Sequence, residues 1–158
     1  MYGVINRQQI IDTVDAVCCV LGNGANNAAN KLILGTIATE TRFGEYRDPT
    51  PFRAGSGLCQ IDQKTFFDIK ARTRKHNKDL ILKEFDISIE NVTYSMLEYN
   101  PLLSVMFCRL FYKLIPEEIE NDIKCLSMYW KRYYNTSLGK GNEQQFIGNY
   151  NYFVKGAL

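Results

Sequence analysis

The sequence predicts one domain of the α+β class that is predominantly α-helical, with a long loop and at most a small β-hairpin. The chain has 158 residues, which is enough for one hydrophobic core and too short for two comfortable ones. Apolar residues recur at helical spacing through most of the sequence, and no repeat, linker or low-complexity tract interrupts it. Residues 1–158 are therefore expected to form a single domain.

Two helices are expected in the first 41 residues. The first covers about residues 6–21, and a second covers about residues 29–41 after a turn at 22–27, with Asn27 as its N-cap. The buried stripe of the first helix consists of Ile10, Val14, Val17 and Leu21. Asp12 and Asp15 interrupt this apolar segment, so it is expected to be a core helix rather than a secretory signal.

The centre of the chain has a different pattern. Residues 42–56 are rich in Gly, Pro, Asp and aromatic residues, which predicts a long loop of the kind that often carries function. Residues 57–61 form a short apolar segment compatible with a strand, and residues 62–73 return to helical spacing.

The C-terminal half predicts three further helices. Asn100 and Pro101 are suited to begin the first of them, and Pro116 is expected to begin the second. The buried stripe of this second helix would be Ile119, Ile123, Leu126 and Trp130. Residues 137–141 end it, and Asn142 can cap the last helix.

Composition argues against several classes of function. A net charge of +2 is too small to require a polyanionic partner, and the basic run at residues 70–78 is expected to be a solvated helix face or loop. A small nucleic-acid binder that uses this run is the weakest alternative, so no nucleic-acid partner is expected. No segment is long enough to cross a bilayer, so stable membrane insertion is not expected either.

Cysteine and histidine usage argues against metal and nucleophilic chemistry. The five cysteines are an odd number without a Cys-x-x-Cys pair, which favours buried reduced thiols over disulfides. The single histidine, His76, lies among cations, so neither a zinc site nor a Ser–His or Cys–His mechanism has the residues it needs. The Gly-Lys-Gly at 139–141 lacks the spacing of a phosphate-binding loop. No metal and no cofactor are expected.

One carboxylate occupies a position where a core residue is expected. Ala29, Ile33 and Ile37 recur every four residues, and the next position on this helical stripe is Glu40. Burial would raise the pKa of this carboxyl, and so would its place near the C-terminal end of a helix, where the dipole disfavours negative charge. A carboxyl that keeps its proton near neutral pH can act as a general acid. The alternative is a glutamate that turns outward into solvent at the helix end.

The segment after Glu40 resembles the goose-type lysozymes and the related lytic transglycosylases. In that superfamily a helix ends in a glutamate, a glycine-rich stretch follows, and a Gly-x-Gly-Leu-x-Gln-hydrophobic pattern comes about twenty residues later. The matching residues here are Glu40, Gly44, Gly55, Gly57, Leu58, Gln60, Ile61 and, as in the goose-type branch, Asp62. A Tyr-Asn pair near the end of a late helix is matched by Tyr134 and Asn135, and the C-terminal stretch is similar to that of small phage endolysins.

This resemblance implies a lysozyme-like fold and a peptidoglycan substrate. Glu40 would protonate the β-1,4 bond between N-acetylmuramic acid and N-acetylglucosamine, and Asp62 or Asp48 would hold the attacking water. If neither does, the 6-hydroxyl of muramic acid closes an anhydro ring, as in a lytic transglycosylase. The presence of Asp62 favours hydrolysis. The alternative role of Asp62 is that of an ordinary N-cap for the helix that follows it. The implied substrate-binding residues are Arg42, Ser56, Gly57, Leu58, Gln60, Tyr134 and Asn135.

Two departures from the family pattern leave a third possibility open. Pro51 stands where the goose-type pattern has a further aspartate, and Thr136-Ser137 replaces Ala-Gly after the Tyr-Asn pair. A non-catalytic cell-wall-binding or structural phage module is therefore the alternative from another class. We expect a monomer that is made in a host cytoplasm without a signal peptide. It would reach periplasmic or cell-wall peptidoglycan after release or as part of a virion.

Overall fold

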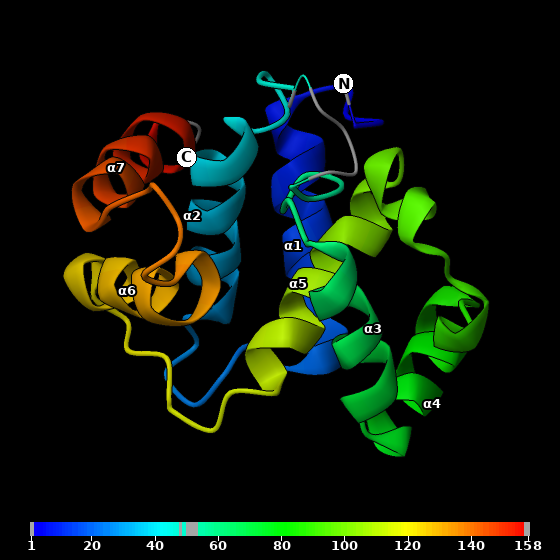
Figure 1. Cartoon of the computed structure of the whole chain (residues 1–158). Coiled ribbons are helices and arrows are strands. Elements are labelled where there is room, and N and C mark those ends of the chain that lie inside the picture. Colours follow the sequence, from blue (N-terminus) through cyan, green and yellow to red (C-terminus); the bar gives the residue numbers. More distant parts are fainter. Residues whose placement is uncertain (1, 48, 50–53, 157–158) are drawn as a thin grey trace.

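The computed structural model describes residues 2–47, 49 and 54–156, and in them the chain folds as an assembly of short helices (Figure 1). The α-helices are α1 (Arg7–Leu21), α2 (Ala29–Thr41), α3 (Gln63–Arg72), α4 (Lys75–Phe85), α5 (Pro101–Lys113), α6 (Ile123–Tyr129) and α7 (Glu143–Asn149). Two 3₁₀ turns, η1 (Ile89–Asn91) and η2 (Tyr94–Glu98), precede α5, and the π-helical segments η3 (Trp130–Asn135) and η4 (Tyr150–Lys155) continue α6 and α7.

The predicted predominance of helix is confirmed, whereas the β component is smaller than expected. Within the described ranges, β structure is limited to one isolated antiparallel bridge between Ser56 and Ile61. The segment 57–61 is therefore a tight turn closed by that bridge and not a strand. None of the helices in these ranges combines the length and the hydropathy that a bilayer span requires.

Side-chain caps begin α1, α5 and α7, and the caps of α5 and α7 are the ones that the sequence predicted. Asn6 accepts a hydrogen bond from the backbone N–H of Gln9, and Asn100 accepts one from that of Leu103. Asn142 forms a reciprocal capping box with Gln145 at the start of α7. These caps satisfy N–H groups that have no partner inside the helix, which explains why local sequence located them.

The expected cap of α2 is wrong. Ala28 occupies the N-cap position without a side-chain hydrogen bond, and Asn27 adopts a left-handed conformation with φ of 51°. The side chain of Asn23 takes over the capping role, because its oxygen accepts a hydrogen bond of 2.8 Å from the backbone N–H of Asn30.

The expected start of the sixth helix at Pro116 is also wrong. This helix begins at Ile123, where the side chain of Asp122 accepts hydrogen bonds from the N–H groups of Lys124 and Cys125. Asp122 supplies a carboxylate that both satisfies these donors and complements the helix dipole, so the start shifts to it.

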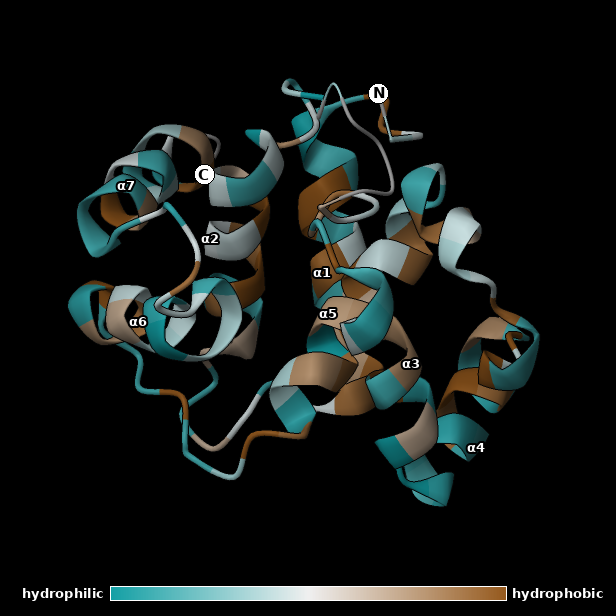
Figure 2. Cartoon of the chain, viewed as in Figure 1, coloured by the Kyte–Doolittle hydropathy of each residue, from teal (hydrophilic) through white to brown (hydrophobic). Residues whose placement is uncertain are grey.

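Helix α2 lies between two groups of helices. It packs against α1 and α5 on one side and against α6, α7 and η4 on the other. Figure 2 shows an apolar face of α2 turned toward α1. Burial is almost continuous along the helix and includes Leu32, Ile33, Leu34, Gly35, Thr36, Ile37, Ala38 and Thr41. The C-terminal end of α2 is therefore fixed by packing from both sides.

Gly35 permits the closest approach between α2 and α7. A Cβ atom at this position would lie 2.2 Å from the ring of the fully buried Phe146, so the ring or the helix would have to shift. We expect Gly35→Ala to lower the free energy of unfolding by about 1–3 kcal/mol through overpacking. Urea unfolding measures this change.

Gly148 in α7 is the matched control, because a Cβ there would meet no atom within 4 Å. We expect Gly148→Ala to raise stability by about 0.5–1 kcal/mol, since alanine is the better helix former. Equal effects of the two substitutions would contradict the packing of α2 against α7.

Candidate active site

Glu40 is the penultimate residue of α2, as the sequence predicted. The chain leaves the helix through a left-handed turn in which Arg42, Phe43 and Gly44 have φ values of 50°, 53° and 79°. The backbone N–H of Arg42 donates to the carbonyl oxygen of Ala38 at 3.2 Å and closes the helix end. The main chain therefore leaves the helical path at Arg42, two residues after Glu40.

Glu40 lines a pocket of about 290 Å³, which we call the Glu40 pocket. Its walls come from the end of α2, from η3, from the turn before α7 and from α7 itself. The lining residues are Thr39, Glu40, Arg42, Trp130, Asn135, Lys140, Gly141, Gln145 and Asn149. Among these described residues Glu40 supplies the single carboxyl group, and amide and cationic side chains supply most of the other polar atoms.

The protein environment raises the pKa of Glu40 from 4.5 to about 7. Desolvation is the main cause: the side chain is partly buried, and the carboxyl group itself is surrounded by protein atoms. The nearby indole N–H of Trp130 offsets part of this effect, because it favours the charged form. Glu40 therefore carries its proton for a large fraction of the time at neutral pH.

Trp130 is the neighbour that most directly affects the carboxyl group. Its side chain is fully buried, and its Nε1 atom has no acceptor at regular hydrogen-bonding geometry among the described residues. A buried donor without an acceptor costs free energy, which a closer approach of the ionised Glu40 carboxylate would recover. Trp130 thus contributes a donor to the site as well as packing to the core.

A second pocket of about 250 Å³, which we call the Gln60 pocket, shares Asn135 with the first. Its lining residues are Gln60, Ile61, Asp62, Thr65, Phe111, Tyr133, Tyr134, Asn135 and Thr136. The hydroxyl of Tyr134 donates to the carbonyl oxygen of Cys59 at 2.5 Å, which ties η3 to the turn that carries Gln60. The two pockets are therefore neighbours that share Asn135 as a lining residue.

Asp62 lies in the Gln60 pocket, not in the Glu40 pocket, and acts as the N-cap of α3. Its Oδ1 accepts a hydrogen bond from the backbone N–H of Thr65 at 2.9 Å, and its Oδ2 accepts one from the Thr65 hydroxyl at 2.7 Å. Both carboxylate oxygens are engaged within the first turn of the helix, so the alternative role foreseen for Asp62 is the one observed. Asp48 and Pro51 lie outside the described residues.

Ser56, Gly57 and Leu58 are buried and line neither the Glu40 pocket nor the Gln60 pocket, so their contact with substrate stays a prediction. Gly57 has a φ of 75°, and a Cβ atom there would lie 2.3 Å from the carbonyl oxygen of Leu97. The glycine is needed because the turn packs backbone to backbone against η2. Its N–H donates to Glu98 Oε2 at 2.9 Å, which anchors the turn further.

The Gly-x-Gly turn is also joined to the end of α2. The hydroxyl of Thr41, the residue after Glu40, donates to the carbonyl oxygen of Leu58 at 2.9 Å. The motif therefore fixes the position of the Glu40 helix end relative to Gln60, and the residues that face outward from it are Gln60 and Asp62.

Six lining residues of the Glu40 pocket are not among the functional residues that the sequence predicts: Thr39, Trp130, Lys140, Gly141, Gln145 and Asn149. Trp130 was assigned to the core because it fits the apolar stripe, and Lys140 was assigned to an ordinary turn. Gln145 and Asn149 had no assigned role, although they are four residues apart in α7 and therefore share one face of that helix. This spacing was the one available signal for a polar face toward Glu40.

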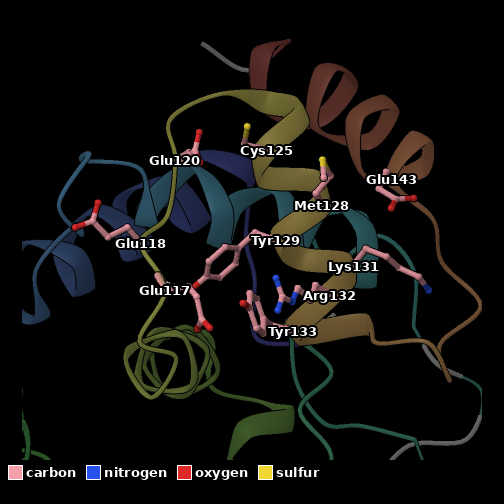
Figure 3. Close-up of a pocket in the computed structure, with 10 residues that line it drawn as sticks. All are labelled: Glu117, Glu118, Glu120, Cys125, Met128, Tyr129, Lys131, Arg132, Tyr133 and Glu143. Carbon is pink, nitrogen blue, oxygen red and sulfur yellow. Dashed lines mark hydrogen bonds between the residues drawn. The ribbon is translucent and has the colours of Figure 1, made fainter.

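A larger pocket of about 440 Å³ lies elsewhere, between the segment before α6 and the start of α7 (Figure 3). Glu117, Glu118 and Glu120 come from that segment, Glu143 comes from α7, and Met128 and Tyr129 come from α6. None of the residues expected from the sequence to be functional lines it.

Comparison with known proteins finds no matching family model, no matching curated protein and no matching solved structure. The resemblance to the lysozyme-like superfamily therefore depends on the sequence motifs alone.

The raised pKa of Glu40 has a consequence for stability. A carboxyl whose pKa is higher in the folded than in the unfolded protein stabilises the fold fully below the unfolded value, here 4.5. That contribution is lost as the pH rises to about 7. We expect the free energy of unfolding of the wild type to fall by about 2–3 kcal/mol between pH 4 and pH 8 relative to that of Glu40→Gln, because the variant has no carboxyl group to ionise.

Urea unfolding of both proteins at the two pH values measures this difference. Glu84→Gln, at an exposed position in α4 outside the Glu40 pocket, is the control, and its change in stability should depend on pH far less than that of Glu40→Gln. A pH-independent difference for Glu40→Gln would show that burial does not perturb the carboxyl group.

Proposed function

We propose that the protein is a peptidoglycan-degrading glycosidase with a lysozyme-like fold and that Glu40 is its general acid. The observation that carries the proposal is a carboxyl group with a pKa of about 7 that lines an open pocket beside amide and indole donors. The bond cleaved is the β-1,4 linkage between N-acetylmuramic acid and N-acetylglucosamine, which is the substrate implied by the Gly-x-Gly-Leu-x-Gln motif.

The acid step follows from the chemistry of the Glu40 pocket. Protonated Glu40 donates its proton to the glycosidic oxygen as positive charge develops on the neighbouring sugar ring. The carboxylate that remains is stabilised by the indole N–H of Trp130, which already favours the charged form. Proton donation and recovery are both accessible near neutral pH, because the pKa is close to it.

The two pockets offer places for the sugars on either side of the bond. Asn135 lines both, so a chain that crosses it would put one sugar near Glu40 and the next near Gln60. Polar amide side chains and the ring of Tyr134 are suited to bind acetamido groups and sugar faces. Arg42, at the rim of the Glu40 pocket, supplies a cation for the acidic lactyl or peptide groups of the substrate.

The engagement of Asp62 favours transglycosylation as the second candidate outcome. Both oxygens of Asp62 accept hydrogen bonds from Thr65, and Asp62 lines the Gln60 pocket and not the Glu40 pocket. The 6-hydroxyl of muramic acid would then attack the anomeric carbon, with Glu40 taking up the hydroxyl proton. The product would be a 1,6-anhydro sugar.

The proposal also covers the oligomeric state and the biological context of the protein. The protein would act as a monomer on peptidoglycan glycan strands, without a cofactor, as an endolysin or a virion component of a bacteriophage. A module of the same fold that binds the cell wall without cleaving it is the alternative from another class, and loss of the Glu40 carboxyl separates the two.

We expect Glu40→Gln to lower the rate at which permeabilised Gram-negative cells are cleared by about 10²–10⁴-fold, because the amide has no proton to donate. Glu84→Gln is the control and should clear cells at the wild-type rate. The wild-type rate should fall as the pH rises above about 7, since Glu40 then loses its proton. Equal clearing by Glu40→Gln and wild type would favour the non-catalytic module.

Mass spectrometry of the released muropeptides determines the product. If Asp62 is confined to its capping role, we expect ends that are lighter than reducing ends by one water, as in 1,6-anhydro muramic acid. Reducing ends alone would contradict transglycosylation and would indicate that a carboxylate positions a water molecule.

A further inference from the structure

A separate pocket of about 350 Å³ lies where the connection between α3 and α4 meets the end of α5. Its lining residues are Thr73, Arg74, His76, Asn77, Leu110, Lys113 and Leu114. None of them belongs to the Glu40 pocket or the Gln60 pocket. The pocket lies within the basic run at residues 70–78, for which the proposed glycosidase has no use.

The N-terminus of α4 opens into this pocket. The helix has 11 residues, and its N-cap, Arg74, makes no side-chain capping hydrogen bond. Backbone N–H groups in the first turn of a helix carry partial positive charge and bind anions when no side chain caps them. Water alone could accept hydrogen bonds from these N–H groups, so the helix N-terminus by itself does not indicate a ligand. The neighbouring side chains determine what the pocket binds.

Asn77 supplies an independent indication of a ligand. The residue is only 8% exposed, and its side-chain amide has no hydrogen-bond partner among the described residues. Neither amide atom is sealed from solvent, so the group reaches into the pocket that Asn77 lines. A bound ligand with acceptor oxygens can therefore reach this amide from the pocket.

The side chains of fixed charge that line the pocket are cations. Arg74, His76 and Lys113 line the pocket, and the described lining includes no carboxylate. Burial lowers the pKa of Lys113, and the positive charges of Arg109 and Arg74 lower it further. Lys113 and Arg109 also donate to the carbonyl oxygens of Leu21 and Gly22, at 2.6 Å and 2.8 Å, which fixes both cations in place.

We propose that this pocket binds a phosphate group. Donors approach it from the first turn of α4, from the Asn77 amide and from the end of α5, so a ligand with three or four acceptor oxygens matches them better than a two-oxygen carboxylate does. A dianion would also offset the electrostatic repulsion that Arg74 and Arg109 exert on Lys113. The inference does not depend on the proposed glycosidase activity.

Titration of the full chain with inorganic phosphate at constant ionic strength and pH 7 tests the site, with backbone amide NMR as the readout. We expect saturable shifts confined to residues 73–78 and 110–114. Asn77→Asp should abolish them, because it replaces the donor amide with a carboxylate of nearly the same shape. Arg74→Gln, at an exposed position that does not threaten folding, should raise the dissociation constant at least tenfold.

Lys83→Gln is the matched control, because it removes a cation from the last turn of the same helix, away from the pocket. Its dissociation constant should equal that of the wild type. A phosphate monoester and a phosphate diester, titrated separately, distinguish a small phosphorylated ligand from a phosphodiester polymer as the source. Non-saturable binding, equal binding by acetate, or equal effects of Arg74→Gln and Lys83→Gln would overturn the proposal.

Discussion

The feature on which the rest of the site depends is the burial of α2 from two sides. Packing against α1 and α5 on one side and α6 and α7 on the other leaves the last turn of this helix no freedom to tilt toward solvent. Glu40 is consequently held where its carboxyl group is largely desolvated. Its raised pKa is a result of helix packing far more than of any single partner, since no cation is needed to produce it.

The turn at residues 55–61 fixes the position of the Gln60 pocket relative to the end of α2. Thr41 bonds to Leu58, Tyr134 bonds to Cys59, and the N–H of Gly57 bonds to Glu98. These contacts join the end of α2, the end of η3 and the turn η2 into one rigid frame. Packing within this chain is enough to explain why residues 55 and 57 are glycines. They allow close backbone contacts that a larger residue would prevent.

Local patterns in the sequence predicted the parts of the fold that local interactions determine. The bounds of α1 and α2, the caps at Asn100 and Asn142 and the position of Glu40 at a helix end all follow from periodicity and capping chemistry. The start of α6 was misplaced, because a proline with acidic neighbours resembles a helix N-terminus as closely as Asp122 does. No local signal separates two such starts.

The parts of the site that depend on tertiary structure could not be predicted in the same way. Trp130 fits an apolar stripe and is buried, yet the direction of its indole N–H is determined by how η3 packs near α2. The burial of Ser56 and Leu58 similarly depends on the turn packing inward. The sequence allows two roles for Asp62; its hydrogen bonds to Thr65 confirm the capping role, and its role toward substrate stays a prediction.

The most direct test is the titration of the Glu40 side-chain carboxyl carbon by NMR, in protein labelled with ¹³C at glutamate. A midpoint near 7 is expected, well separated from the ordinary glutamate value of 4.5. Assignment of the signal through its loss in Glu40→Gln makes the measurement specific to this residue. A midpoint at 4.5 would contradict the account, because a carboxyl group that is ionised at neutral pH has no proton to give to a glycosidic oxygen.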